Sequence, residues 1–176
     1  MPHGGGDADF PWKSIWKVKA PLKVAFFAWS ATLGKILTTE NLRQRGVILV
    51  NWWCMCKQDG DSVDQLLLHC SMARELWALA LSLFGVHWDM LVRVVDLLTW
   101  WKGWFARHNG DIWNAIPLCI TWIIWRERNG WTFEDTDWTM LAVRLISLRT
   151  LYEWMATMSG HSFSSLLEFL GLHTFT

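Results

Sequence analysis

The chain lacks the features that mark secreted, membrane and nucleotide-binding proteins. Its first ten residues, MPHGGGDADF, contain no apolar run of the kind found in signal peptides. The longest uncharged apolar runs, Leu76–Trp88 and Ile112–Trp125, have 13 and 14 residues, short of the ~20 that span a bilayer. It has no phosphate-binding P-loop. We therefore expect a nuclear or cytoplasmic protein that is neither secreted nor embedded in a membrane.

Catalytic motifs are also missing. Tyr152 is the only tyrosine and is followed by Glu153, so the chain has no Tyr-x-Asp-Asp turn of the kind that holds two metal ions in a polymerase. A nucleophile pair of Cys70 and His69 is disfavoured, because adjacent residues on a helix do not face one another. The sequence therefore predicts a protein that is not an enzyme.

Positive charge is concentrated in the N-terminal third of the chain. Residues 11–57 carry eight Lys or Arg against one acid, Glu40, which gives this segment a net charge of +7 in a neutral chain. Such a segment can bind phosphate or an acidic partner, or it can be an ordinary solvated surface. Sixteen tryptophans, far above ordinary usage, indicate aromatic packing and leave apolar surface for a protein partner or for self-association.

The pattern of apolar residues predicts an all-α fold, with no alternating strand pattern and no repeat of fixed period. We expect a polar lead-in at 1–9, a compact domain at 10–88 and a helical extension at 89–176. Asp111 is the expected cap of one long helix, and Asn129-Gly130 its expected end. The other expected helix starts and ends are Pro21 as a first helical residue, Gly34 and Gly46 as ends, Thr38 or Thr39 as a cap, Ser62 with Gln65 as a capping box, and the acidic Asp135–Asp137 before a helix start. The segments expected to be helical are Phe10–Lys19 (a short turn), Pro21–Leu33, Glu40–Arg45, Val63–His69, Ser71–Phe84, Leu91–Phe105, Ile112–Arg128, Met140–Met158 and Phe163–Leu170.

Three of the four cysteines fall in one stretch, Trp52–Cys70, which reads WWCMCKQDGDSVDQLLLHC. Cys54, Cys56, His69 and Cys70 could supply four zinc ligands, with a turn carrying the first pair and a helix the second. The Cys-x-Cys gap is tighter than usual, and side chains at 69 and 70 diverge by about 100° on a helix. The clustering still favours a metal site over a disulfide scaffold.

Two other features of the chain have simpler explanations. Asp59, Asp61 and Asp64 hint at a calcium loop, but Cys70 stands where a bidentate Glu is needed, so a solvated turn is favoured. Cys119 lies among Ile, Leu and Trp in the middle of an expected helix, which indicates a small buried hydrophobic residue.

Two long segments, FPWKSIWKVKAPLKVAFFAWSATLGKILTTENLRQRG and CMCKQDGDSVDQLLLHCSMARELW, resemble the zinc-binding domain that follows the reverse transcriptase of plant LINE-type (non-LTR) retrotransposons. The segment IPLCITWIIWRERNGWTFED resembles the helical tail after that domain. The resemblance covers 10–88 closely and 89–158 more loosely. It implies an accessory domain that holds RNA or DNA. Its phosphate contacts would come from Lys13, Lys17, Lys19, Lys23, Lys35, Arg43 and Arg45.

The same resemblance implies a zinc cofactor with ligands in the order Cys-x2-Cys, a spacer, and His-x4-Cys. Cys56 and Cys70 occupy the second and fourth of these positions, whereas Trp53 and Gln65 occupy the first and third. Trp is no zinc ligand and Gln is a poor one. The nearest replacements are Cys54 and His69. We interpret the stretch as a damaged zinc knuckle, and the alternative function is a helical protein-interaction remnant without metal.

Overall fold

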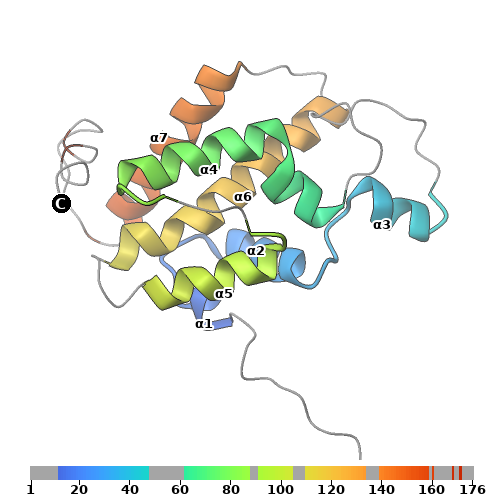
Figure 1. Ribbon diagram of the computed structural model, residues 1–176, viewed down its shortest axis with the longest axis horizontal. Coiled ribbons are helices and arrows are strands. Elements are labelled where there is room, and N and C mark those ends of the chain that lie inside the picture. The colour runs from blue at the N-terminus through green and yellow to red at the C-terminus, as the bar shows by residue number, and fades with distance from the viewer. Residues whose placement is uncertain are drawn as a thin grey trace, which may run out of the picture.

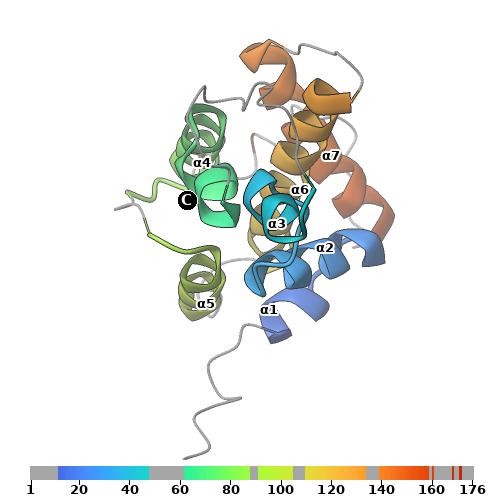
Figure 2. The ribbon, with the colours of Figure 1, turned by 90° about the vertical axis from the view of Figure 1, so that its right-hand side faces the viewer.

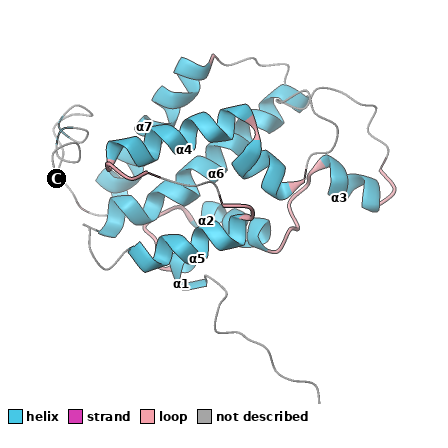
Figure 3. Cartoon of the chain, in the orientation of Figure 1, coloured by secondary structure: helices cyan, strands magenta, loops and turns pink. Residues whose placement is uncertain are grey.

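The protein folds into a bundle of helices, shown here as a computed structural model (Figure 1). The structure describes residues 12–47, 62–87, 91–104, 110–133 and 139–158, together with Gly160, Glu168 and Gly171. Within these ranges every regular element is a helix and none is a strand (Figure 3). The predicted all-α class is therefore confirmed.

Three short helices make up the N-terminal part: α1 (Trp12–Trp16), α2 (Leu22–Thr32) and α3 (Thr39–Gln44). Pro21 is the N-cap of α2, whereas the sequence predicted it as the first helical residue. Its fixed φ and its missing N–H are compatible with either position at a helix start. Thr38 caps α3, its Oγ1 accepting from the Asn41 N–H at 3.2 Å. Gly46 follows α3 with φ +75°, which residues other than glycine rarely adopt.

The middle of the chain forms a π-helical turn, η1 (Gln65–His69), followed by α4 (Ser71–Leu83) and α5 (Val94–Trp104). The expected helix over Val63–His69 is present, but its last turn is wider than the α-helix that we predicted. The expected helix at Leu91 begins only at Val94.

The longest helix, α6 (Gly110–Phe133), runs through the centre of the bundle, with α2, α4, α5 and α7 (Met140–Met158) packed around it (Figures 1 and 2). Its predicted bounds were wrong at both ends, because Gly110 and Asn129-Gly130 lie inside it. Asn129 Oδ1 accepts from Arg128 at 3.3 Å. An internal glycine costs only about 1 kcal/mol, which the packing of so long a helix can offset.

Pro117 lies inside α6, and a side chain from another helix compensates for it. Proline has no N–H, so the carbonyl of Trp113, four residues earlier, loses its helical partner. The indole Nε1 of Trp101 on α5 donates to this carbonyl at 3.0 Å, and the two tryptophan rings stack with centroids 4.3 Å apart. The pair joins α5 to α6 at the point where the ladder of helical hydrogen bonds is interrupted.

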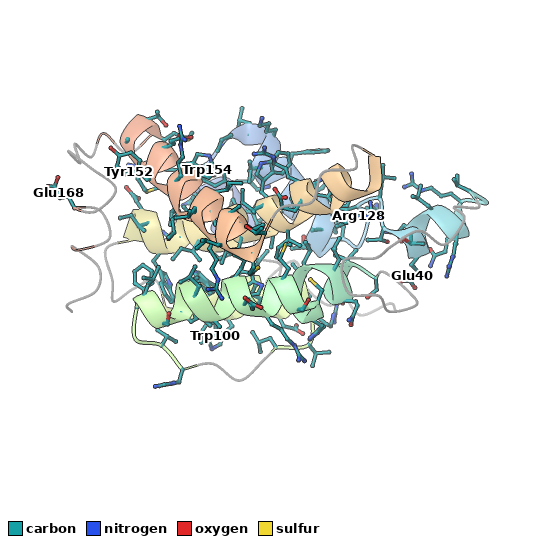
Figure 4. The ribbon with its side chains drawn as sticks, turned by 90° about the horizontal axis from the view of Figure 1, so that it is seen from above. Glu40, Trp100, Arg128, Tyr152, Trp154 and Glu168 are labelled. Atoms are coloured by element: carbon teal, nitrogen blue, oxygen red, sulfur yellow. The ribbon has the colours of Figure 1, made fainter. Side chains whose placement is uncertain are left out.

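A single cluster of buried side chains connects the N-terminal helices to the C-terminal ones, from Ile15 to Met155. Phe27 of α2 lies between the rings of Trp122 and Trp125 on α6, with centroids 5.6 and 5.3 Å away. Arg128 of α6 donates to the Leu37 carbonyl, between α2 and α3, at 3.0 Å; Figure 4 shows Arg128 at the end of α6 nearest α3. Segments 10–88 and 89–176 thus share this core, and the boundary between them stays a prediction.

Two smaller expectations are met. Helix α7 has the predicted bounds. Thr139 caps it, because its Oγ1 accepts from the Ala142 N–H at 3.3 Å. Cys119 is buried, and burial raises the pKa of its thiol to about 12.

Within the described residues, no helix combines the length and hydropathy needed to cross a bilayer. The expected helix Phe163–Leu170 and the acidic segment Asp135–Asp137 lie outside the described residues, apart from Glu168.

Candidate metal turn and basic face

The candidate metal turn is the segment Ser62–Cys70, which contains η1. Ser62 Oγ accepts from the Gln65 N–H at 3.1 Å, which is half of the predicted capping box. The Cys70 N–H then donates to the Gln65 carbonyl at 2.8 Å, closing a turn of five residues instead of four. Positions 65 and 70 are thereby one turn apart, so the His-x4-Cys spacing of the resembling family would put both ligands on one side. In this chain position 65 carries glutamine.

Side chains satisfy the carbonyl groups at the end of this turn. The Cys70 thiol donates to the Leu66 carbonyl at 3.2 Å, and the Trp77 indole donates to the Leu67 carbonyl at 2.9 Å. The Cys70 sulfur also accepts from the Ala73 N–H at 3.3 Å, so Cys70 is the N-cap of α4. The buried thiol therefore has a structural role in this conformation that involves no metal.

Two polar contacts attach the turn to the start of α5. Val94 is the first residue of α5, and its N–H donates to Asp64 Oδ1 at 2.8 Å. His69 Nε2 donates to the Val92 carbonyl at 3.0 Å. The side chain of Asp64 thus caps a helix 30 residues away. This contact replaces the solvated turn that the sequence indicated for Asp64.

Only part of the predicted zinc-ligand set can be placed. His69 and Cys70 lie in the described region, and each makes hydrogen bonds there. Trp53, Cys54 and Cys56 lie outside the described residues. Among the residues that the structure describes, no three His, Cys, Asp or Glu side chains gather as a metal site would require. The four-ligand zinc site therefore stays a prediction.

The basic residues spread over α1, α2, α3 and the segments that join them. Those with exposed side chains are Lys17, Lys23, Lys35, Arg43 and Arg45. Lys19 forms a 2.9 Å ion pair with Asp111 at the start of α6, and the Lys23 ammonium lies 5.6 Å from the centre of the Trp122 ring. The side chain of Lys13 lies outside the described set.

Lys23 and Arg43 lie on α2 and α3, and Lys17, Lys35 and Arg45 lie on the segments beside these helices. In Figure 2, α1, α2 and α3 are to the right of α4 and α5, and Figure 1 shows α3 to the right of α2. No acidic residue occurs between positions 12 and 39, and Glu40 is the first one reached along the chain from there. We call this side, with Lys17, Lys23, Lys35, Arg43 and Arg45, the basic face.

Residues 3–77 match the family model for zinc-binding in reverse transcriptase. This match spans α1 to the middle of α4, and so contains the whole basic face and the metal turn. It confirms the reverse-transcriptase zinc-binding part of the resemblance and covers less than half of the chain. The plant LINE-type origin and the relation of the helical tail to such elements stay predictions. Neither the curated proteins nor the solved structures contain a match.

Sequence reasoning missed the residues that hold the metal turn. It places Asp64 in a solvated turn and gives no indication that the Trp77 indole donates to the Leu67 carbonyl. The sequence gives no signal for the Cys70 cap, because cysteine is not among the residues preferred as N-caps.

Proposed function

We propose that this chain is a non-catalytic accessory domain derived from the reverse transcriptase of a plant LINE-type retrotransposon, and that it binds RNA or DNA through its basic face. The family match over residues 3–77 supports the reverse-transcriptase origin. The observation that carries the binding proposal is the set of five exposed cations on α2, α3 and the segments beside them, in a stretch with one acid. Phosphate contacts by such cations supply most of the affinity in sequence-independent binding.

We also propose that the domain keeps its fold without a tightly bound zinc ion. Gln65 at the third ligand position supports this, because glutamine is a poor zinc ligand. The hydrogen bonds of Cys70, Trp77 and Asp64 around η1 support it as well, since they connect the turn to α4 and α5. If zinc is bound, Cys56 and Cys70 are the ligands in family register, with Cys54 and His69 as replacements.

Salt-dependent binding tests the nucleic-acid proposal. Fluorescence anisotropy of labelled single-stranded RNA, single-stranded DNA and duplex DNA is measured between about 50 and about 200 mM salt. We expect the affinity of the full chain to fall with salt. A triple variant, Lys17→Ala, Lys35→Ala and Arg45→Ala, should weaken binding to every sequence. On single strands it should lower the log–log salt slope by up to about 0.7 for each phosphate that the variant no longer neutralises.

A matched triple variant controls for net charge. Arg74, Arg93 and Arg149 are exposed and lie outside the basic face, so their replacement by Ala removes the same charge. This variant should retain most of the affinity. Equal weakening by the two triple variants would show that overall charge and not the basic face binds, and unchanged binding in the first would reject the proposal.

A helical protein-interaction module is the alternative function. The observation that favours it is a row of exposed apolar side chains on α2, which nucleic-acid binding does not require.

A further inference from the structure

Helix α2 and the residue after it carry a row of large apolar side chains on the outer face. Leu22, Phe26 and Leu33 are 79%, 57% and 40% exposed. Trp29 completes the row, half-buried, with its ring 5.6 Å from that of Phe26. We call these four residues the outer row of α2.

The opposite face of the same helix already supplies the core. Val24, Ala25, Phe27, Ala28 and Ala31 are buried. Helix α2 is thus apolar on two faces, and the bundle buries only one of them. Single exposed apolar residues are common on proteins and need no explanation. Four of them aligned along one short helix form a continuous patch of the kind that marks an interaction site.

The spacing of the outer row is that of a helix-packing seam. Its members follow one another at intervals of four, three and four residues, which is the alternation of a and d positions in paired helices. A second helix lying along α2 would contact every member. Base stacking requires aromatic rings, and both ends of the row are leucines, so the pattern favours a helix over a nucleic acid.

The charges beside the row indicate the chemistry of that second helix. Lys23 borders the row on α2 and Lys35 follows the helix, with no acid anywhere between positions 12 and 39. Lys19, which precedes the helix, is already paired with Asp111 of α6. A second copy of this chain would bring the same lysines together, which is unfavourable. Acidic residues beside the apolar seam of the partner would pair with them.

We propose that the outer row of α2 docks an amphipathic helix of another protein, one with acidic residues flanking its apolar seam. This apolar site differs from the nucleic-acid contacts proposed above, but Lys23 and Lys35 of the basic face lie beside it.

A designed peptide tests the proposal on the full chain. The probe is a labelled three-heptad helix with Leu at a and d and Glu at e and g. A charge-reversed version has Lys at e and g, and fluorescence anisotropy measures the affinity of each. We expect the acidic peptide to bind at least about tenfold more tightly than the reversed one. The double variant Leu22→Ser, Phe26→Ser should weaken the acidic peptide at least about tenfold.

A matched variant on another helix provides the control. Leu141 and Leu145 of α7 are 66% and 53% exposed and have the same i, i+4 spacing as Leu22 and Phe26. The double variant Leu141→Ser, Leu145→Ser should bind the acidic peptide like the parent. Far-UV circular dichroism checks that both variants keep the parent helix content.

Three results would overturn the proposal. These are equal binding of the two peptides by the parent chain, equal loss in the two variants, and no binding of either peptide. If the α2 variant loses helix content, the comparison of the two peptides on the parent chain decides. Sedimentation in which the α2 variant abolishes self-association, without peptide binding, would assign the row to a second copy. Weaker RNA binding by that variant, again without peptide binding, would assign it to nucleic acid.

Discussion

At the scale of single residues, Trp101 compensates for the hydrogen bond that Pro117 removes from α6. Its indole N–H satisfies the carbonyl that Pro117 leaves without a helical partner. Replacing Trp101 by Phe should destabilise the protein by about 1–3 kcal/mol, because a buried carbonyl loses its partner. Chemical denaturation of the variant and the parent measures this difference.

The variant Pro117→Ala supplies the matched background for that measurement. Alanine restores an N–H that can donate to the Trp113 carbonyl, so Trp101→Phe should cost less in this background than in the parent. An identical cost in both backgrounds would show that the loss comes from ring packing alone.

Glu127 is a buried carboxyl group that should make the stability of the protein depend on pH. It is 5% exposed on α6, one of its carboxylate oxygens has no hydrogen-bond partner, and burial raises its pKa despite the opposing effect of Arg126. The folded state therefore holds this proton more tightly than the unfolded state. Protonation of Glu127 therefore stabilises the folded state. This contribution is fully present below the pKa of Glu127 in the unfolded state and is lost as pH rises through its higher pKa in the folded state.

The variant Glu127→Gln removes this dependence. It should raise the melting temperature at pH 7 and leave it nearly unchanged near pH 4, where the parent carboxyl is already protonated. Thermal unfolding at the two pH values measures both differences. The same shift at both pH values would mean that the ionised carboxylate is not the destabilising group.

At the scale of secondary-structure elements, the helix pattern and the helix caps were readable from the sequence. The bounds of α7, the cap at Thr38 and the ends at Gly34 and Gly46 follow from local rules about apolar spacing and backbone freedom. The course of α6 through Asn129-Gly130 was not readable, because tertiary packing of a long central helix outweighs the local preference of two residues.

The candidate metal turn was only partly predictable. The Ser62 cap was identified from its spacing, whereas the widened turn of η1 and the contacts of Asp64 and Trp77 depend on neighbours far along the chain. The resemblance identified positions 65 and 70 as a ligand pair. Only the structure shows that the π-helical turn puts them one turn apart.

Variants of Cys70 test whether its thiol stabilises η1 and α4 through hydrogen bonds or as a zinc ligand. Serine is a preferred N-cap and can make the same two hydrogen bonds, so Cys70→Ser should change the free energy of unfolding by less than about 1 kcal/mol. Cys70→Ala removes both bonds and should cost about 1 kcal/mol or more. Equal losses in the two variants, together with a loss of bound zinc, would mean that the sulfur is a metal ligand and not a cap.

At the scale of the whole molecule, one shared core joins the family-matched residues to the helices that follow them. Phe27 lies between two tryptophans of α6, and Arg128 of α6 binds the Leu37 carbonyl. Both α2 and α4 pack against α6. Helix α6 therefore gives the family-matched helices an apolar surface to fold on that does not depend on a metal. A small zinc domain standing alone would need its metal for stability.

The zinc content of the full chain tests this account most directly. The protein is purified without chelator, its zinc is measured beside that of the Cys54→Ser and Cys56→Ser variants, and each is melted with and without a chelator. We predict well under one zinc ion per chain and the same melting temperature with and without chelator. One zinc ion per parent chain, absent from both variants and accompanied by a lower melting temperature in chelator, would contradict the account.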